Sequence, residues 1–207
     1  MLRVGVRLPA ATGRIGDYLA DVIALEAAGA DTVWLDATAA VSIEPWILLG
    51  AVAAVTHRIR MGVTVGAEAG WRGAVDTLRR LSSDRLVLGM RPPGKVKTLK
   101  GSTAPLPSIL FICASQSEAE QSALRSDGVI LPGTADEVRT LRALEGDFEL
   151  WADVSVPSDK AGWVNMIAAM EAAGATGIIV AWDPRLIDLL RSAGEPDDRT
   201  DLLIATG

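Results

Sequence analysis

Short apolar segments rich in Val and Ile alternate along the chain with longer segments of helical periodicity. This alternation is typical of βα units around a parallel sheet, because strands buried on both faces are continuous apolar runs. Eight runs are predicted as strands, and seven helices are predicted among them. The expected strands are Arg3–Leu8, Thr32–Asp36, Ile59–Val65, Leu86–Met90, Ile109–Ala114, Gly128–Pro132, Glu149–Val156 and Gly177–Trp182. The expected helices cover residues 14–28, 45–56, 72–82, 116–125, 135–145, 159–173 and 184–193.

The connection between the fourth and fifth strands, Arg91–Pro107, has no helical pattern. It contains Pro92, Pro93 and two further prolines, together with Gly94 and Gly101, and both residue types interrupt helices. The segment is nevertheless long enough for a parallel crossover, which needs roughly a dozen residues. The pattern therefore predicts a (β/α)8 barrel that lacks the helix after its fourth strand.

One joint between a helix and a strand occurs twice. Leu25–Val33 and Met170–Ile178 each contain Glu-Ala-Ala at a helix end, a Gly suited to the left-handed position, and a strand. A doubly wound sheet also uses such joints and is the alternative fold. Even strand spacing, with no Gly-x-Gly-x-x-Gly after the first strand, favours the closed barrel. We expect one barrel domain over residues 1–207, with an acidic tail at 194–207.

Composition limits the classes of partner. The net charge is -6, which argues against a nucleic-acid or anionic-membrane partner, because phosphate contacts need clustered Lys and Arg. The single cysteine and single histidine exclude an intramolecular disulfide and sites that need two imidazoles. Charged residues interrupt the first segment, and no apolar run reaches about 18 residues. We expect a cytoplasmic protein with a small-molecule substrate.

Three aspartates follow predicted strands. Asp36, Asp153 and Asp183 would converge at the carboxyl-end mouth of a barrel, as acid–base groups or magnesium ligands. The alternative is that Asp183 caps the helix that begins near Pro184 and that Asp153 is merely exposed. The sequence leaves both interpretations open.

A cationic group follows the fourth strand. Arg91, Lys95, Lys97 and Lys100 include three of the four lysines of an acidic chain. Such a cluster predicts a binding site for a phosphate or a polycarboxylate tail. A solvated loop is the alternative.

After the fifth strand, the polar turn Ala114–Ser117 opens a helix, and its free N–H groups and hydroxyls suit a phosphate. Capping of the helix by Ser115 or Ser117 is the alternative. His57 is expected at a helix end on the opposite face of the barrel, and Cys113 in the core, since no histidine is near it in the sequence.

Several segments, read together, resemble the luciferase-like monooxygenase superfamily, the flavin- and F420-dependent barrels. The matches cover most of residues 2–131 in family order and are Ala24–Trp34, Glu44-Pro45-Trp46, Leu48–Gly62, Thr77–Gly89, Pro107–Phe111 and Ser126–Ile130. The resemblance implies FMN or F420 at the carboxyl-end mouth, in contact with Asp36, with the end of the third strand and with Gly89 onward. It also implies a non-prolyl cis peptide within Val63–Val65 and a Gly-rich phosphate turn after the fifth strand.

The chain departs from this family in three places. It is shorter than typical members, the Gly-Gly turn is replaced by Cys113-Ala114-Ser115, and the His that often follows the acidic residue of the second strand is Ala37. These changes affect catalysis more than fold, and a shortened flavin-binding relative without catalysis is known in the superfamily.

The resulting hypothesis is a flavin- or F420-dependent oxidoreductase or monooxygenase that transfers hydride to or from a small organic substrate. We expect Asp36, Thr64 and Gly89 at the cofactor ring, and no catalytic proton donor is identified. The expected contacts to the anionic part are Ala114, Ser115 and Ser117 for the phosphate, and Arg91, Lys95 and Lys97 for the tail.

Two alternatives come from other classes. An inactive relative would bind only the cofactor, or would act without one as a homodimeric interaction module whose partner covers the barrel where the helix is missing. A cofactor-free isomerase or lyase would use Asp36, Asp153 and Asp183.

Overall fold

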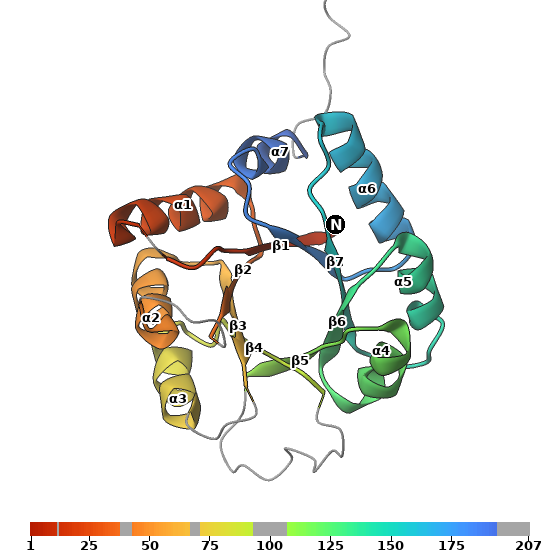
Figure 1. The fold of residues 1–207 in the computed structure, drawn as a ribbon, viewed down its shortest axis with the longest axis horizontal. Helices are drawn as coiled ribbons and strands as arrows, with labels where there is room; N and C mark the ends of the chain where they lie inside the picture. The colour runs from red at the N-terminus through yellow and green to blue at the C-terminus, as the bar shows by residue number, and fades with distance from the viewer. Residues whose placement is uncertain (12, 38–42, 67–70, 93–106, 194–207) are drawn as a thin grey trace, which may run out of the picture.

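The computed structural model describes residues 1–11, 13–37, 43–66, 71–92 and 107–193. Within them, eight parallel strands form a closed barrel in sequence order, with helices around the outside (Figure 1). The strands are β1 (Arg3–Arg7), β2 (Thr32–Asp36), β3 (Arg60–Val65), β4 (Leu86–Met90), β5 (Ser108–Ile112), β6 (Gly128–Pro132), β7 (Glu149–Val154) and β8 (Gly177–Ala181). The helices are α1 (Ile15–Ala28), α2 (Pro45–Val55), α3 (Arg72–Leu81), α4 (Gln116–Ser122) with the short 3-10 helix η2 (Ala123–Arg125), α5 (Ala135–Arg142), α6 (Lys160–Ala172) and α7 (Leu186–Ala193).

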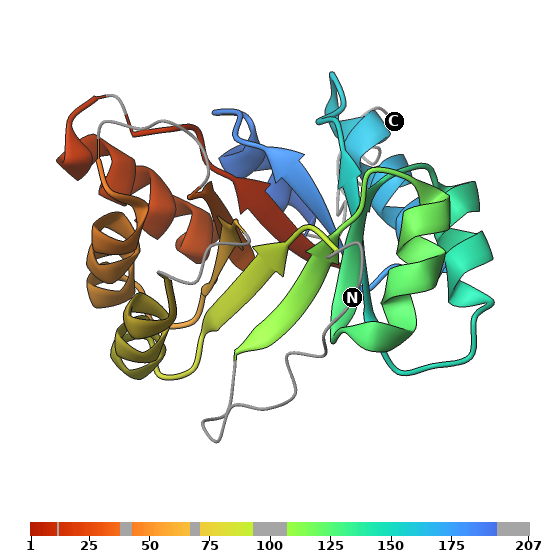
Figure 2. The same ribbon diagram turned by 60° about the horizontal axis from the view of Figure 1, so that its bottom comes forward.

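The barrel and the order of its elements are confirmed. Every predicted strand is present, and β4 follows α3 and leads to β5 with no helix among the residues of that connection that the structure describes (Figure 2). Residues 93–106 of the connection and the tail 194–207 lie outside the described part. None of the described helices is long and apolar enough to span a membrane.

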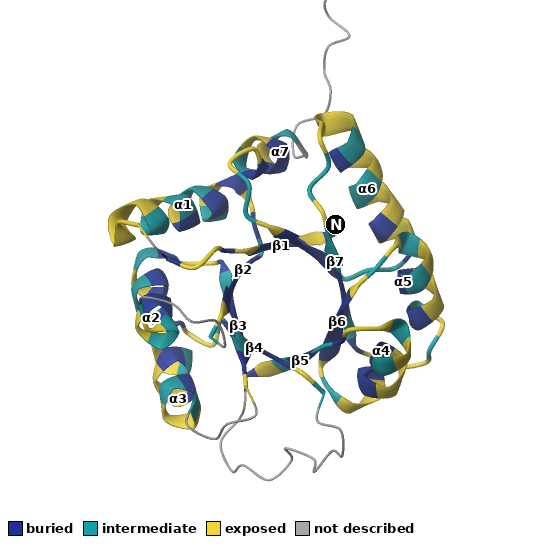
Figure 3. Cartoon of the chain, viewed as in Figure 1, coloured by how far each residue is buried: buried dark blue, intermediate teal, exposed yellow. Residues whose placement is uncertain are grey.

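Side chains fill the centre of the barrel. One inward-facing cluster contains Trp34, Val87, Leu110, Ile130, Trp151 and Ile179, and the strands around it are mostly buried (Figure 3). A Cβ atom on Gly62 would lie 2.2 Å from Cδ2 of Trp34, so the indole occupies the space that a β3 side chain would need. The barrel interior is therefore a packed core and not a channel, as in other barrels of this type.

The repeated joint closes the amino-end face of the barrel. Gly29 and Gly174 end their helices with φ of 95° and 87°, a conformation that glycine adopts without steric cost. Glu26 Oε1 accepts the backbone N–H groups of three consecutive residues, His57, Arg58 and Ile59, at 2.6–2.9 Å. His57 thus lies between α2 and β3, at the amino-end face of the barrel, as predicted. Glu26 has a structural role, because it joins α1 to the segment that leads into β3.

Candidate active site

Three of the predicted cofactor contacts lie side by side at the carboxyl-end mouth. In the parallel ladder Asp36 is the partner of Thr64, and Thr64 is the partner of Gly89, so β2, β3 and β4 bring them into one row. Asp36 is two residues after inward-facing Trp34, and alternate strand residues share a face. The row therefore belongs to the inner wall of the mouth.

An ion pair that sequence reasoning missed completes this rim. A guanidinium nitrogen of Arg7, at the end of β1, donates to Oδ2 of Asp153, near the end of β7. Both side chains are partly exposed, at 45% and 30%. The alternation of Arg3, Gly5 and Arg7 along β1 was a signal that Arg7 faces inward. Its partner Asp153 could not be predicted, because the contact depends on how β7 and β8 close against β1.

Trp34 forms the floor beneath the row. A Cβ on Gly89 would lie 2.9 Å from Cζ3 of Trp34 and 2.9 Å from Cδ1 of Ile112. The indole Nε1 of Trp34 is buried and has no hydrogen-bond partner within the described structure. The mouth therefore combines an apolar, aromatic floor with charged and hydroxyl groups at its rim.

The turn predicted to bind phosphate is capped by its own helix. Ser115 Oγ accepts the N–H of Glu118 at 3.3 Å, and the Ala114 N–H donates to Oε2 of Glu118 at 2.7 Å. Ser117 Oγ accepts from Nε2 of Gln121 at 3.4 Å. These contacts match the capping interpretation of the turn, and an anion at Ala114 would have to displace the Glu118 carboxylate.

The cationic group is only partly described. Arg91 is exposed immediately after β4, beside the mouth. Lys95, Lys97 and Lys100 lie outside the described residues.

The three aspartates do not act as one group. The Asp183 carboxylate accepts from the backbone N–H of Arg185 and, at 2.8 and 3.0 Å, from its guanidinium. These hydrogen bonds lower the pKa of Asp183 to about 2, so it holds no proton near neutral pH. Asp153 pairs with Arg7, and no metal-binding cluster of His, Cys, Asp and Glu occurs in the described ranges. The Asp183 carboxylate therefore contacts the turn that precedes α7, and the helix itself begins at Leu186.

Two further expectations concern the backbone and the thiol. The cis peptide implied within Val63–Val65 is wrong for this chain, since all described peptide bonds are trans and β3 pairs regularly with β4 through Thr64 and Val65. Cys113 is buried, and burial raises the pKa of its thiol to about 11, as expected for a core residue rather than a nucleophile.

A pocket opens beside the mouth, between the β1–α1 connection and the start of α2. Its volume is about 40 Å³, and it is partly open to solvent. Its lining residues are apolar except for Asp36, and they are Leu8, Pro9, Ala10, Ala11, Leu35, Asp36, Ile43, Pro45 and Leu48. Asp36 therefore borders both the mouth and this pocket.

No family model matches the sequence, and no curated protein matches it either. Solved structures do match. F420-dependent tetrahydromethanopterin reductase from Methanopyrus kandleri has a TM-score of 0.70 at 10% identity, over 94% of this chain and 97% of that chain. An F420-dependent secondary alcohol dehydrogenase in complex with an F420-acetone adduct has a TM-score of 0.65 at 13% identity, over 93% and 98%.

Tryptophan synthase from M. tuberculosis, in its aminoacrylate-bound form, has a TM-score of 0.63 at 16% identity, over 92% of this chain and 90% of that chain. At such identities the likeness concerns the fold, and one barrel hosts many chemistries. The chain shares its (β/α)8 barrel with these F420-dependent enzymes and with tryptophan synthase.

Proposed function

We propose that the chain is an F420- or FMN-dependent oxidoreductase or monooxygenase, active in the cytoplasm, that binds its cofactor at the carboxyl-end mouth. The observation that carries this proposal is the row Asp36, Thr64 and Gly89, together with the Arg7–Asp153 pair at the same mouth and above the indole of Trp34. Ligands of (β/α)8 barrels bind at this end, where strand ends and loops converge.

The chemistry of the rim fits the ring of such a cofactor. One edge of a flavin or deazaflavin ring carries carbonyl oxygens and an N–H group, which need donors and an acceptor. The Arg7 guanidinium and the Thr64 hydroxyl donate, and the Asp36 carboxylate accepts. Gly89 leaves the wall flat beside Trp34, whose indole excludes water from below.

When bound, the cofactor supplies hydride transfer, and the protein supplies binding, orientation and exclusion of water. Arg91, with Lys95 and Lys97, is the proposed contact for an anionic tail. Such a tail favours F420, whose chain carries several carboxylates, over FMN. The turn Ala114, Ser115 and Ser117 remains the proposed phosphate contact, and its use requires that Glu118 release the Ala114 N–H.

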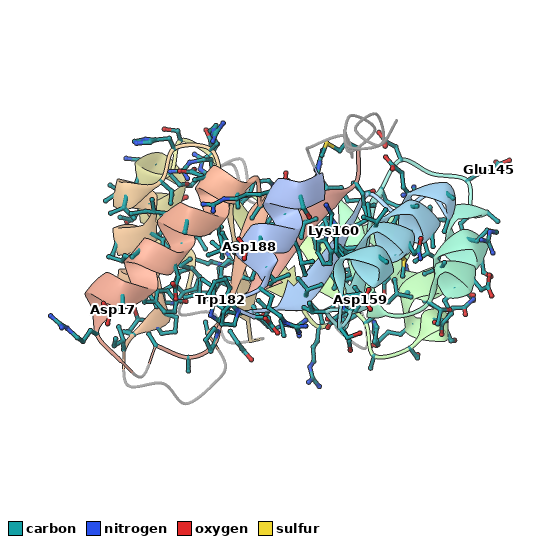
Figure 4. The ribbon with its side chains drawn as sticks, turned by 90° about the horizontal axis from the view of Figure 1, so that it is seen from above. Asp17, Glu145, Asp159, Lys160, Trp182 and Asp188 are labelled. Atoms are coloured by element: carbon teal, nitrogen blue, oxygen red, sulfur yellow. The ribbon has the colours of Figure 1, made fainter. Side chains whose placement is uncertain are left out.

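The test is a fluorescence titration of the protein with F420 and with FMN at two salt concentrations. Micromolar F420 binding that weakens with salt is expected, together with a loss of about ten-fold or more for Arg7→Ala, since charge-assisted hydrogen bonds are strong. Glu145→Gln is the matched control, because Glu145 points away at the far edge of the barrel (Figure 4). Absence of binding by both cofactors would overturn the proposal.

The second candidate is an inactive relative that works as a homodimer. It is favoured by the break in the ring of helices, because α3 and α4 make little contact within the described residues whereas the other neighbouring helices pack together. A second copy of the chain would cover this gap. Light scattering at micromolar concentration tests the dimer, and a monomer at all concentrations would contradict it.

A further inference from the structure

Helix α2 is apolar on every side, although it lies at the surface of the molecule. Its 11 residues, Pro45–Val55, include no charged residue and no Ser, Thr, Asn or Gln. The barrel buries one side of this helix, through Leu48, Leu49, Val52 and Ala53. A helix without a polar side is normally covered all round, so the outward side of α2 is expected to have a partner.

The outward side of α2 is a stripe of four residues. Ile47, Gly50, Ala51 and Ala54 have the spacing i, i+3, i+4 and i+7, which places them on one face of the helix. Ile47 is 71% exposed and Ala54 is exposed, whereas Gly50 and Ala51 between them are partly buried. Because the two central residues are small, a second helix can approach this stripe closely.

The neighbouring helices extend the apolar surface. α1, α2 and α3 lie side by side along one flank of the barrel (Figure 1). Ile23 of α1 is exposed and lies one turn before Glu26, which contacts the residues after α2, so Ile23 is on the α2 side. Leu81 of α3 is exposed and lies one turn after Leu78, whose Cδ2 is 3.9 Å from the position of a Cβ on Gly50. The three helices thus share one apolar surface, and surfaces of this kind mark contact sites.

Charges beyond the two ends of α2 indicate which partner fits. Exposed Glu44 precedes the helix and caps it, and exposed Arg58 follows its end, so that Ala51 is midway between them. A second copy packed antiparallel on α2 would place each Ile47 against an Ala54 and each Glu44 against an Arg58. A carboxylate accepts several hydrogen bonds, so Glu44 can bind this arginine and still cap α2. The surface is therefore complementary to itself, as a two-fold interface must be.

We propose that the chain forms a homodimer through α2, with the two α2 helices antiparallel about a two-fold axis near Ala51. This interface is separate from the break between α3 and α4, which is on the far side of α3, and from the mouth of the barrel. It is therefore independent of cofactor binding. Three short helices bury an area at the low end for specific interfaces, so the expected affinity is micromolar.

Sedimentation velocity over a range of micromolar concentrations tests this dimer. The unchanged protein should pass from monomer to dimer as its concentration rises. Ile47→Lys places a charge near both ends of the paired stripes and should weaken dimerisation about a hundred-fold, since a buried unpaired charge is costly. Its thermal unfolding should stay unchanged, because the Ile47 side chain is exposed in the single chain.

Leu124→Lys is the matched control. Leu124 is 64% exposed and lies on η2, beyond the break in the ring of helices. This variant should dimerise like the unchanged protein. Loss of the dimer in Leu124→Lys but not in Ile47→Lys would place the contact at the break and overturn the α2 interface.

Charge reversal tests the antiparallel arrangement. Arg58→Glu places two carboxylates together at each end of the interface and should weaken the dimer about ten-fold, while the cap of α2 stays intact. Glu44→Lys should also weaken it, and an equimolar mixture of the two variants, both folded by circular dichroism, should recover the dimer because opposite charges then meet at both ends. No recovery in the mixture would overturn the arrangement. An unchanged protein that stays monomeric at all concentrations would overturn the proposal.

Discussion

The two mouths of the barrel are charged in different ways. At the amino end the Glu149 carboxylate accepts from Arg3 Nη1 at 3.0 Å, Arg60 Nη1 at 3.5 Å and Trp151 Nε1 at 2.8 Å. At the carboxyl end the described charges include two partly exposed pairs, Arg7 with Asp153 and Arg185 with Asp183, beside Asp36 and Thr64. The first mouth is a closed network within the chain, whereas the second presents polar groups to solvent.

The difference indicates that the polar groups of the amino-end mouth stabilise the fold, whereas those of the carboxyl-end mouth are available for function. Burial raises the pKa of Glu149, but the Trp151 hydrogen bond and the two arginines outweigh it, so the pKa lies below its ordinary value. The charged Glu149 side chain thus contributes to the stability of the folded protein. In barrels of this type polar residues at the amino end serve stability, and those at the carboxyl end serve chemistry.

The largest expected effect concerns the indole that separates the two mouths. Gly62→Ala places a methyl group 2.2 Å from Trp34 Cδ2, and a rigid indole yields less than a flexible side chain. We expect a loss of about 3 kcal/mol in the free energy of unfolding, measured by urea denaturation. Gly73→Ala, in the exposed first turn of α3 with open space around it, is the control and should cost nothing. Equal stability of both variants would show that Trp34 does not fill the barrel.

Loss of a charge should lower the free energy of unfolding more at the amino-end mouth than at the carboxyl-end mouth. Glu149→Ala leaves Arg3, Arg60 and the Trp151 N–H without their shared acceptor and should cost about 2 kcal/mol of unfolding free energy. Urea denaturation of the variant measures this value. A loss below about 0.5 kcal/mol, the scale of an ordinary surface pair, would remove the contrast between the mouths.

The same carboxylate predicts a pH dependence. Its pKa is lower in the folded than in the unfolded protein, so its contribution is complete above the unfolded value of about 4.3 and is lost as pH falls through the folded value. Urea midpoints between about pH 7 and pH 3 should therefore fall less steeply for Glu149→Gln. Parallel curves for the two proteins would contradict the assignment.

The smallest effect on stability is expected at the carboxyl-end mouth. Asp153→Ala breaks a pair whose side chains are 45% and 30% exposed, and such pairs contribute about 0–1 kcal/mol. Thermal unfolding should change little, while cofactor affinity changes because Arg7 loses its partner. A stability loss as large as that of Glu149→Ala would assign this mouth a structural role as well.

Much of the fold was predictable from the sequence, because the burial of each strand or helix determines the spacing of its apolar residues. The strands β2, β4 and β6 were predicted with their observed bounds, since both their faces are buried and their apolar runs are continuous. Asp36 and Thr64 followed from the common end of parallel strands, whereas Gly89 was implied by the resemblance to the luciferase-like superfamily.

Contacts between distant segments were not predictable in this way. The Arg7–Asp153 pair joins residues 146 positions apart, and the pocket depends on how the β1–α1 connection meets α2. The capping of Ser115 was different, because Ser115-Gln116-Ser117-Glu118 is a capping-box sequence and its local partner was visible in the sequence.

The position of Trp34 also makes it an optical reporter. Its indole lies directly under the row where a flavin or deazaflavin would sit, so energy transfer from this residue to the bound ring should quench its emission. Trp34→Phe would remove that quenched component and leave the emission of the other five tryptophans of the chain. The residue that closes the centre of the barrel can thus report whether the mouth above it is occupied.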